Sequence, residues 1–260
     1  MRWYIKHMKT VNTVSYVLVA IILIGSLLLD AKTSVLVAEA LCSGTYFIAL
    51  AIFSSIAQKK CLERAKEILE NDCNPIEICE ITSAIYKENS KSSANIINYC
   101  YALFVFDEGS YENVGVALEQ IKSTHMAITS KYEEALFYSL LCSINLHFGE
   151  LTTAEESYKR GYEAYNGITK EGQSKEIQFL LLINIVNLLI VKGDIDRARS
   201  ELYNIDESTR RGRVEKLFLQ AKIDLVEGKS DEAREKLQRV VSLGGGLAIT
   251  KEADELLENE

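Results

Sequence analysis

The stretch IVKGDIDRARSEL, from Ile190 to Leu202, decides the fold because near copies of it recur along the chain. One copy, LHFGELTTAEESY, starts at position 146, and another, LVEGKSDEAREKL, starts at position 225. In each copy apolar residues precede a Gly, and an Ala stands five positions after that Gly. A Gly can end a helix with positive φ because it has no Cβ, so each copy predicts a joint between two helices.

The joints mark successive units of similar length. Their glycines are Gly109, Gly149, Gly193 and Gly228, and the alanines that follow are Ala154, Ala198 and Ala233. The chain resembles the tetratricopeptide repeat family, whose helix-turn-helix unit has about 34 residues, because Gly193 and Gly228 are 35 positions apart. The resemblance implies an all-α fold in which antiparallel helix pairs stack into a solenoid over residues 94–260, ending in a capping helix. The family favours a Pro near the end of each unit, and none occurs there.

Composition favours helices and excludes one class of partner. The chain has 260 residues, 48% of them hydrophobic, and a single Pro. Its formal net charge is -8 at pH 7, and no basic stripe interrupts the acidic part of the sequence. Nucleic-acid binding depends mainly on Lys and Arg that neutralise phosphates, so we expect no nucleic-acid partner.

Two apolar runs near the start predict a membrane anchor. Residues 11–29 and 34–57 are each about long enough to cross a bilayer as a helix. A short polar turn joins them, which predicts a transmembrane helical hairpin. Lys and Arg flank both runs and tend to stay on the cytoplasmic side. We therefore expect a basic cytoplasmic segment at 1–10, a membrane-proximal helix pair at 58–93, and both termini in the cytoplasm, in a bacterial inner membrane.

Other interpretations of the N-terminal part are open to the same residues. Ala38-Glu39-Ala40 has the small residues of a signal-peptide cleavage site, but it lies inside the second apolar run. Glu39 is the ionisable residue within a predicted span, and such residues are candidates for function. It also lies close enough to the end of the run to reach water or Lys32 by extending its side chain.

The sequence shows no pattern typical of catalysis. Its three His have no metal-ligand spacing, and its six Cys include no C-x-x-C pair. Gly244-Gly245-Gly246 precedes neither a Lys-Ser nor a Lys-Thr pair, which favours a turn over a phosphate site. We expect no enzyme activity, no metal and no cofactor.

Polar residues on the first helix of each pair are the candidate binding residues, because these helices line the concave surface of a solenoid. They are Tyr99, Ser139, Ser143, Asn184, Asn187 and Lys222. Buried Asn side chains require hydrogen-bond partners, so the set forms either an internal network or a groove that binds a peptide. Both interpretations stay open at this point.

These features together predict a membrane-anchored scaffold or adaptor. The lipid bilayer and an unidentified protein or peptide are its expected partners, and the hairpin is a possible site of homo-oligomerisation. The alternative function is a small oligomeric membrane or sensor element, built in the hairpin around Glu39, Gly44 and Thr45 and regulated by the repeats. Small residues such as Gly44 would let the two spans approach closely or let the hairpin self-associate.

Overall fold

The computed structural model describes residue 4 and residues 7–28, 33–89, 91–107, 110–169 and 174–259. Within these residues the chain forms twelve α-helices and no strand, which confirms the all-α class. In chain order they are α2 (Met8–Leu28), α3 (Thr33–Asp72), α4 (Ile76–Glu88), α5 (Ser93–Phe106), α6 (Tyr111–Ser123), α7 (Lys131–His147), α8 (Leu151–Asn166), α9 (Lys175–Val191), α10 (Ile195–Tyr203), α11 (Arg210–Val226), α12 (Ser230–Leu243) and α13 (Ala248–Glu258).

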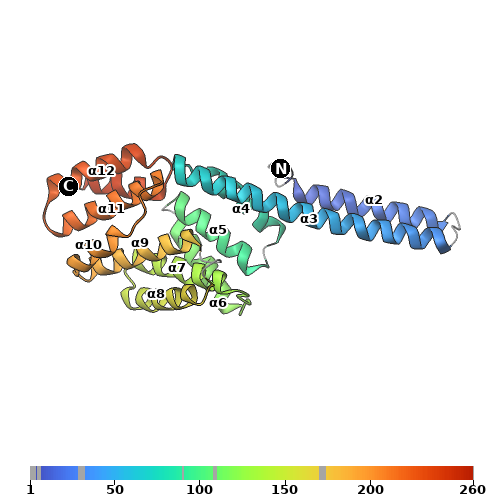
Figure 1. The fold of residues 1–260 in the computed structure, drawn as a ribbon, viewed down its shortest axis with the longest axis horizontal. Helices are drawn as coiled ribbons and strands as arrows, with labels where there is room; N and C mark the ends of the chain where they lie inside the picture. Colours follow the sequence, from blue (N-terminus) through green and yellow to red (C-terminus); the bar gives the residue numbers. More distant parts are fainter. Residues whose placement is uncertain are drawn as a thin grey trace.

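Helices that follow one another in the sequence pack as pairs (Figure 1). The pairs are α5 with α6, α7 with α8, α9 with α10, and α11 with α12. The first helices of successive pairs also pack on each other, α5 on α7, α7 on α9 and α9 on α11, and so form an inner layer. The last helix, α13, packs on α12 and also contacts α5 and α11.

The Gly residues between paired helices adopt the backbone that ends a helix. Gly149, Gly193 and Gly228 have φ angles of 75°, 76° and 73°. At Gly193 the next amide, that of Asp194, donates to the Leu189 carbonyl at 2.9 Å. This bond back across the last turn is the Schellman motif, and the same pattern occurs at the other two joints. Ala154, Ala198 and Ala233 are fully buried where the helices meet, and Gly109 lies outside the described residues.

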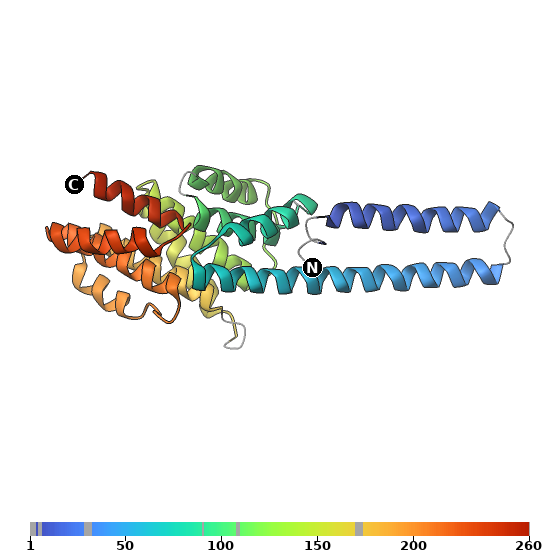
Figure 2. The same cartoon turned by 90° about the horizontal axis from the view of Figure 1, so that it is seen from above.

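α2 and α3 form a hairpin that projects from the other helices (Figures 1 and 2). Large apolar side chains on both helices are exposed, among them Ile21 and Ile48. The segment Val37–Asp72 is long and apolar enough to cross a membrane, and it is mostly exposed. Among the described residues, α2 contributes a shorter apolar stretch, Thr10–Ile24. The part of the chain that the structure describes therefore contains one helix long and apolar enough to span a membrane, where the sequence predicted two.

Polar side chains join the two helices of the hairpin. The Ser15 hydroxyl lies 2.9 Å from that of Tyr46. Nearer the tip, the Ser26 hydroxyl donates to Glu39 Oε1 at 2.6 Å. The predicted contact of Glu39 with water or Lys32 stays a prediction, because Lys32 lies outside the described residues.

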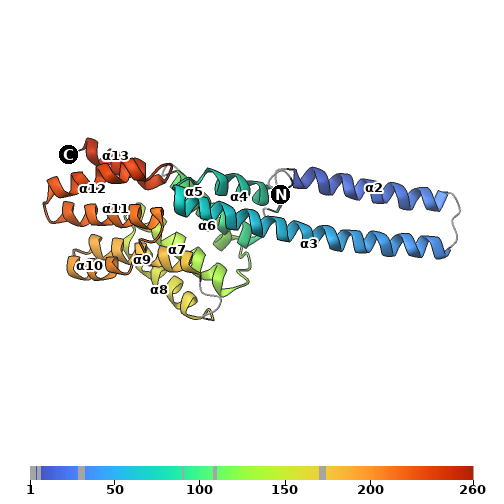
Figure 3. The same cartoon turned by 45° about the horizontal axis from the view of Figure 1, so that its top comes forward.

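α3 belongs both to the hairpin and to the helical body. It runs for 40 residues without a break, and its C-terminal part packs on α4 and α11 (Figure 3). Just after its end, the Cys73 carbonyl accepts a hydrogen bond from the Gly246 amide at 3.0 Å. The loop between α12 and α13 therefore closes on the end of α3, which explains the three consecutive Gly residues at 244–246. A Cβ on Gly245 would lie 2.8 Å from the Cys73 carbonyl oxygen.

The closure predicts a difference between two Gly→Ala substitutions. Gly245 and Gly228 both have positive φ, but a Cβ on Gly228 would meet no atom within 4 Å. Gly228→Ala is expected to lower the free energy of unfolding by about 1 kcal/mol, from the backbone conformation alone. Gly245→Ala adds a steric overlap, and we expect a loss of about 2–3 kcal/mol. Denaturant unfolding of the two full-length variants in detergent measures the difference, and equal losses would contradict the closure.

Candidate functional site

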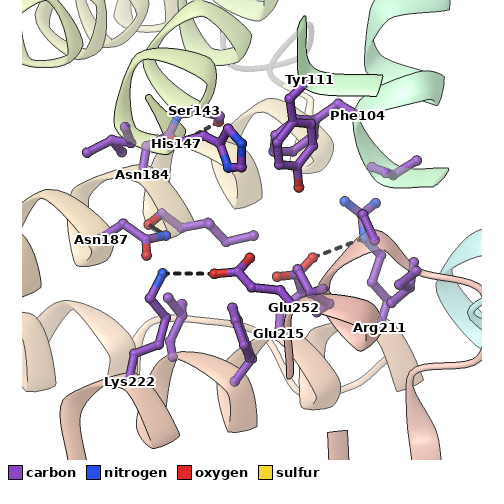
Figure 4. A pocket seen from close by; sticks show the side chains of 18 of the residues that line it. Phe104, Tyr111, Ser143, His147, Asn184, Asn187, Arg211, Glu215, Lys222 and Glu252 are labelled. Atoms are coloured by element: carbon purple, nitrogen blue, oxygen red, sulfur yellow. Dashed lines mark hydrogen bonds and ion pairs between the residues drawn. The ribbon is translucent and has the colours of Figure 1, made fainter. Parts of the chain in front are cut away.

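A cavity of about 130 Å³ lies on the inner helix layer. Its wall is formed by side chains from α5, α6, α7, α9 and α11, together with α13 and the residue that precedes it. We call it the central pocket. Figure 4 shows polar and charged side chains pointing into it from helices that are far apart in the sequence.

The structure brings four of the six predicted binding residues together. Ser143, Asn184, Asn187 and Lys222 all line the central pocket. Ser139 is fully buried and does not line the pocket. Tyr99 lies elsewhere and stacks on Tyr86, with 4.9 Å between the ring centroids. α9 and α11 therefore supply three of the four predicted residues at the pocket.

One side of the pocket is an internal hydrogen-bond network. Ser143 Oγ donates to Asn184 Oδ1 at 2.7 Å, and Asn184 Nδ2 donates to the Ser139 carbonyl at 2.8 Å. Asn187, one turn further along α9, is partly exposed and donates to the Ile183 carbonyl at 3.0 Å. The two serines and Asn184 thus satisfy one another and link α7 to α9, whereas Asn187 lies at the pocket surface.

The opposite side contains a buried arginine. Arg211 is 1% exposed. Its Nη1 donates to Glu70 Oε1 of α3 at 3.0 Å and to the Tyr101 hydroxyl of α5 at 2.6 Å. Burial opposes the charged form, but the negative groups around Arg211 outweigh this effect and raise its pKa. Arg211 therefore stays protonated and joins helix α3 to the pocket.

Two carboxylates lie side by side in the middle of the pocket (Figure 4). Glu215 is 8% exposed, and its Oε1 lies 3.9 Å from Arg211 Nε, which is longer than a hydrogen bond. Burial raises the pKa of the Glu215 carboxyl to about 7, in spite of the opposing charge of Arg211. Glu252 of α13 lies 3.5 Å from the Lys222 ammonium. The pocket therefore holds a carboxyl that titrates near neutral pH.

Aromatic rings form the remaining wall. Phe104 stacks on Tyr111 with 5.2 Å between centroids, and Tyr111 meets the His147 ring edge to face at 4.4 Å. The Lys222 ammonium lies 5.3 Å from the centroid of Phe218. Flat apolar rings beside carboxylates are a favourable environment for a positive charge.

Arg211, Glu215, Glu252 and His147 line the pocket but were not predicted from the sequence. A local signal did exist, because Arg211 and Glu215 share a helix face with Phe218, at i, i+4 and i+7. Charged residues at core positions of that face indicate a buried ion pair. His147 and Glu252 carried no comparable signal, since their helices contain many polar residues.

The thiols of the helical body are unsuited to nucleophilic chemistry. Burial raises the pKa of Cys79, Cys100 and Cys142 to about 12. Such thiols stay protonated at neutral pH and react slowly. Among the described residues, no group of three or more His, Cys, Asp or Glu side chains is placed to hold a metal ion.

No known protein family matches this chain, and searches of curated proteins and of solved structures found nothing significantly similar.

Proposed function

We propose that the chain is a membrane-anchored helical-repeat scaffold, in which a tetratricopeptide-like repeat domain is held at the cytoplasmic face of a membrane and binds a protein there. One observation carries the proposal. The apolar, exposed hairpin and the helical body share the unbroken helix α3. An exposed apolar surface of this extent requires a nonpolar environment, and a bilayer supplies it.

The anchor's proposed orientation follows from charge. Exposed lysines, Lys59 and Lys60, follow the apolar part of α3, and Lys and Arg flanking a span favour the cytoplasmic side. With α2 as a second span, both ends of the hairpin lie on that side. Confinement to the membrane raises the effective concentration of the repeat domain for partners at the same surface.

The inner layer supports binding rather than catalysis. Its pocket combines polar, charged and aromatic side chains from six helices, as recognition sites do. The thiols of Cys79, Cys100 and Cys142 stay protonated. The Ser143 hydroxyl at the pocket donates to Asn184, which is not a base. We therefore assign the pocket to recognition of a protein partner.

Site-specific photo-crosslinking in cells tests this function. Val191 is 62% exposed and lines the central pocket, whereas Val116 is 71% exposed and lies on the outer helix α6. A photoreactive amino acid at position 191 is expected to give a defined protein adduct, and the same amino acid at position 116 is expected to give none. An absence of adduct at 191, or equal adducts at both positions, would reject the scaffold.

The contacts of Glu39 favour a structural part in the hairpin over the sensor function. Its Oε1 accepts the bond from Ser26 and so ties α3 to α2. A Cβ on Gly44 would meet no atom within 4 Å, so this small residue serves no close approach within the hairpin. The outward face at Gly44 stays open to a second copy, which is where we place the proposed self-association.

A further inference from the structure

Glu215 and Glu252 are the carboxylates that line the central pocket. Arg211 also lines the cavity, and its Nε is buried without a hydrogen-bond partner. The Glu215 side chain keeps 11% of its surface exposed and points into the cavity (Figure 4). It pairs with Arg211 Nε only at 3.9 Å, and the described residues give its carboxylate no hydrogen bond. A nearly buried acceptor without a donor calls for one.

The carboxylates that line the pocket share their cations. Glu215 and Glu252 line it together with Arg211 and Lys222, but Arg211 also pairs with Glu70 outside the cavity. Arg211 is also engaged on its far side by Glu70 and Tyr101, away from the cavity. A buried negative charge is expensive unless it is neutralised, so the site favours either a proton or an added cation.

The aromatic wall and the size of the cavity fit such a cation. Tyr111 and Phe218 line the cavity, and the Lys222 ammonium already lies 5.3 Å from the Phe218 centroid, within the range of a cation–π contact. The volume of about 130 Å³ is several times what one water requires. We propose that the central pocket binds a primary ammonium or guanidinium group between Glu215 and Glu252. The bound group partly displaces the Lys222 ammonium from Glu252.

This inference rests on the proposed function, because it assumes that the central pocket is the recognition site. It adds that the recognised group is a cation. Such a group belongs either to a Lys or Arg side chain of a protein partner or to a free polyamine. We favour the side chain, because the cavity holds only the head of a ligand while the exposed Val191 at its margin leaves room for a chain outside.

Ligand titration on the full-length protein in detergent tests the proposal. The probes are blocked arginine, its neutral analogue blocked citrulline, and spermidine. Blocked arginine is expected to bind at least tenfold more tightly than blocked citrulline. Tighter binding of spermidine than of blocked arginine would overturn the assignment to a side chain, and equal binding of arginine and citrulline would overturn the cation site itself.

Substitutions of the carboxylates and of Lys222 are expected to change the affinity for blocked arginine in opposite directions. Glu252→Gln and Glu215→Gln are each expected to weaken blocked arginine by at least tenfold, and Lys222→Met to strengthen it severalfold by removing the competing ammonium. Glu255→Gln is the matched control, because Glu255 is exposed on the same helix α13 and does not line the pocket. Unchanged affinity in both carboxylate variants, or weaker binding after Lys222→Met, would contradict the proposal.

A proton readout separates direct contact from a structural effect. Glu215 faces Arg211 and Lys222 on α11, Glu70 on α3 and Glu252 on α13, and His147 on α7 lines the same cavity. Because the Glu215 carboxyl is partly protonated at neutral pH, binding of a cation there should release a proton. Calorimetry in buffers of different ionisation enthalpy is expected to detect this release in the parent protein and a much smaller one in Glu215→Gln. No release in the parent would count against contact with Glu215.

The test also separates this inference from the scaffold. If the photo-adduct at position 191 forms and persists in Glu215→Gln and Glu252→Gln while blocked arginine fails to bind, the scaffold stands and the cation site is rejected. If the adduct forms and both substitutions abolish it, the partner uses the proposed site.

Discussion

Arg211→Met is expected to lower the free energy of unfolding by about 3–5 kcal/mol, the loss typical when one member of a buried ion pair is removed. Arg211 is fully buried and bonds Glu70 and Tyr101. Without it, the carboxylates of Glu70 and Glu215 would face each other without an intervening cation. Denaturant unfolding of the detergent-solubilised protein measures the loss.

Arg213→Met is the matched control for that experiment. Arg213 lies on the same helix but is exposed, and among the described residues its side chain bonds the Glu207 carbonyl, at 3.0 Å. Its replacement is expected to change the free energy of unfolding by less than about 1 kcal/mol. Adding Glu215→Gln to Arg211→Met should recover part of the stability, because it removes one of the stranded charges. Similar losses for the two arginines would show that Arg211 does not hold α3, α5 and α11 together.

Ile48→Arg and Ile21→Arg are each expected to release most of the protein from the membrane. Both side chains are exposed in the middle of the apolar hairpin, at 63% and 61%. An Arg at the centre of a span costs about 2.5–3.5 kcal/mol of insertion free energy, roughly a hundredfold in the equilibrium. Extraction of membranes with alkaline carbonate measures the retained fraction. Ile76→Arg, at an exposed position of α4, is the control and should stay with the membrane.

The same pair of substitutions distinguishes one span from two. If Ile48→Arg alone releases the protein, α2 does not span, and the two termini lie on opposite sides.

Cysteine labelling provides an independent check of orientation. Native Cys61 and Cys73 are buried, so their reactivity does not show which side of the membrane they face. The probe is therefore Ser200→Cys, at an exposed site on α10, in a Cys42→Ser background. A membrane-impermeant maleimide is expected to label it only after permeabilisation, and labelling of intact cells would contradict a cytoplasmic repeat domain.

The helix joints could be predicted because their signal is local. A Gly after an apolar run and the Ala five positions later lie within two turns, and the hydrogen bonds of the joint at Gly193 span only five residues. The burial of Arg211 could not be predicted in this way, since its partners Glu70 and Tyr101 are 141 and 110 positions away. Only the closure of the last helices on α3 brings these groups together.

The boundary at residue 57 shows a second limit of the sequence pattern. Apolar residues are followed by charged ones there, which predicts a change in the environment of the chain. It does not predict the end of the helix. No Gly or Pro interrupts the chain between Gly44 and Pro75, so the helix continues.

Tyr99 is a candidate site residue that the sequence placed wrongly. It shared the helix-face pattern of the other candidates, yet it packs against Tyr86 because α5 and α4 pair there.

The unbroken helix α3 has a mechanical consequence. Forty residues extend for about 60 Å, and a bilayer's hydrocarbon core takes up about half of that length. With α3 inserted as proposed, its C-terminal half lies outside the lipid. Because no flexible linker intervenes, that half fixes both the distance and the orientation of the repeat domain relative to the membrane. Glu70 near the end of α3 bonds Arg211. Axial rotation or tilting of α3 within the lipid would therefore strain the bond to Arg211, whose side chain lines the pocket. Movement of the membrane helix would thus be transmitted directly to the pocket.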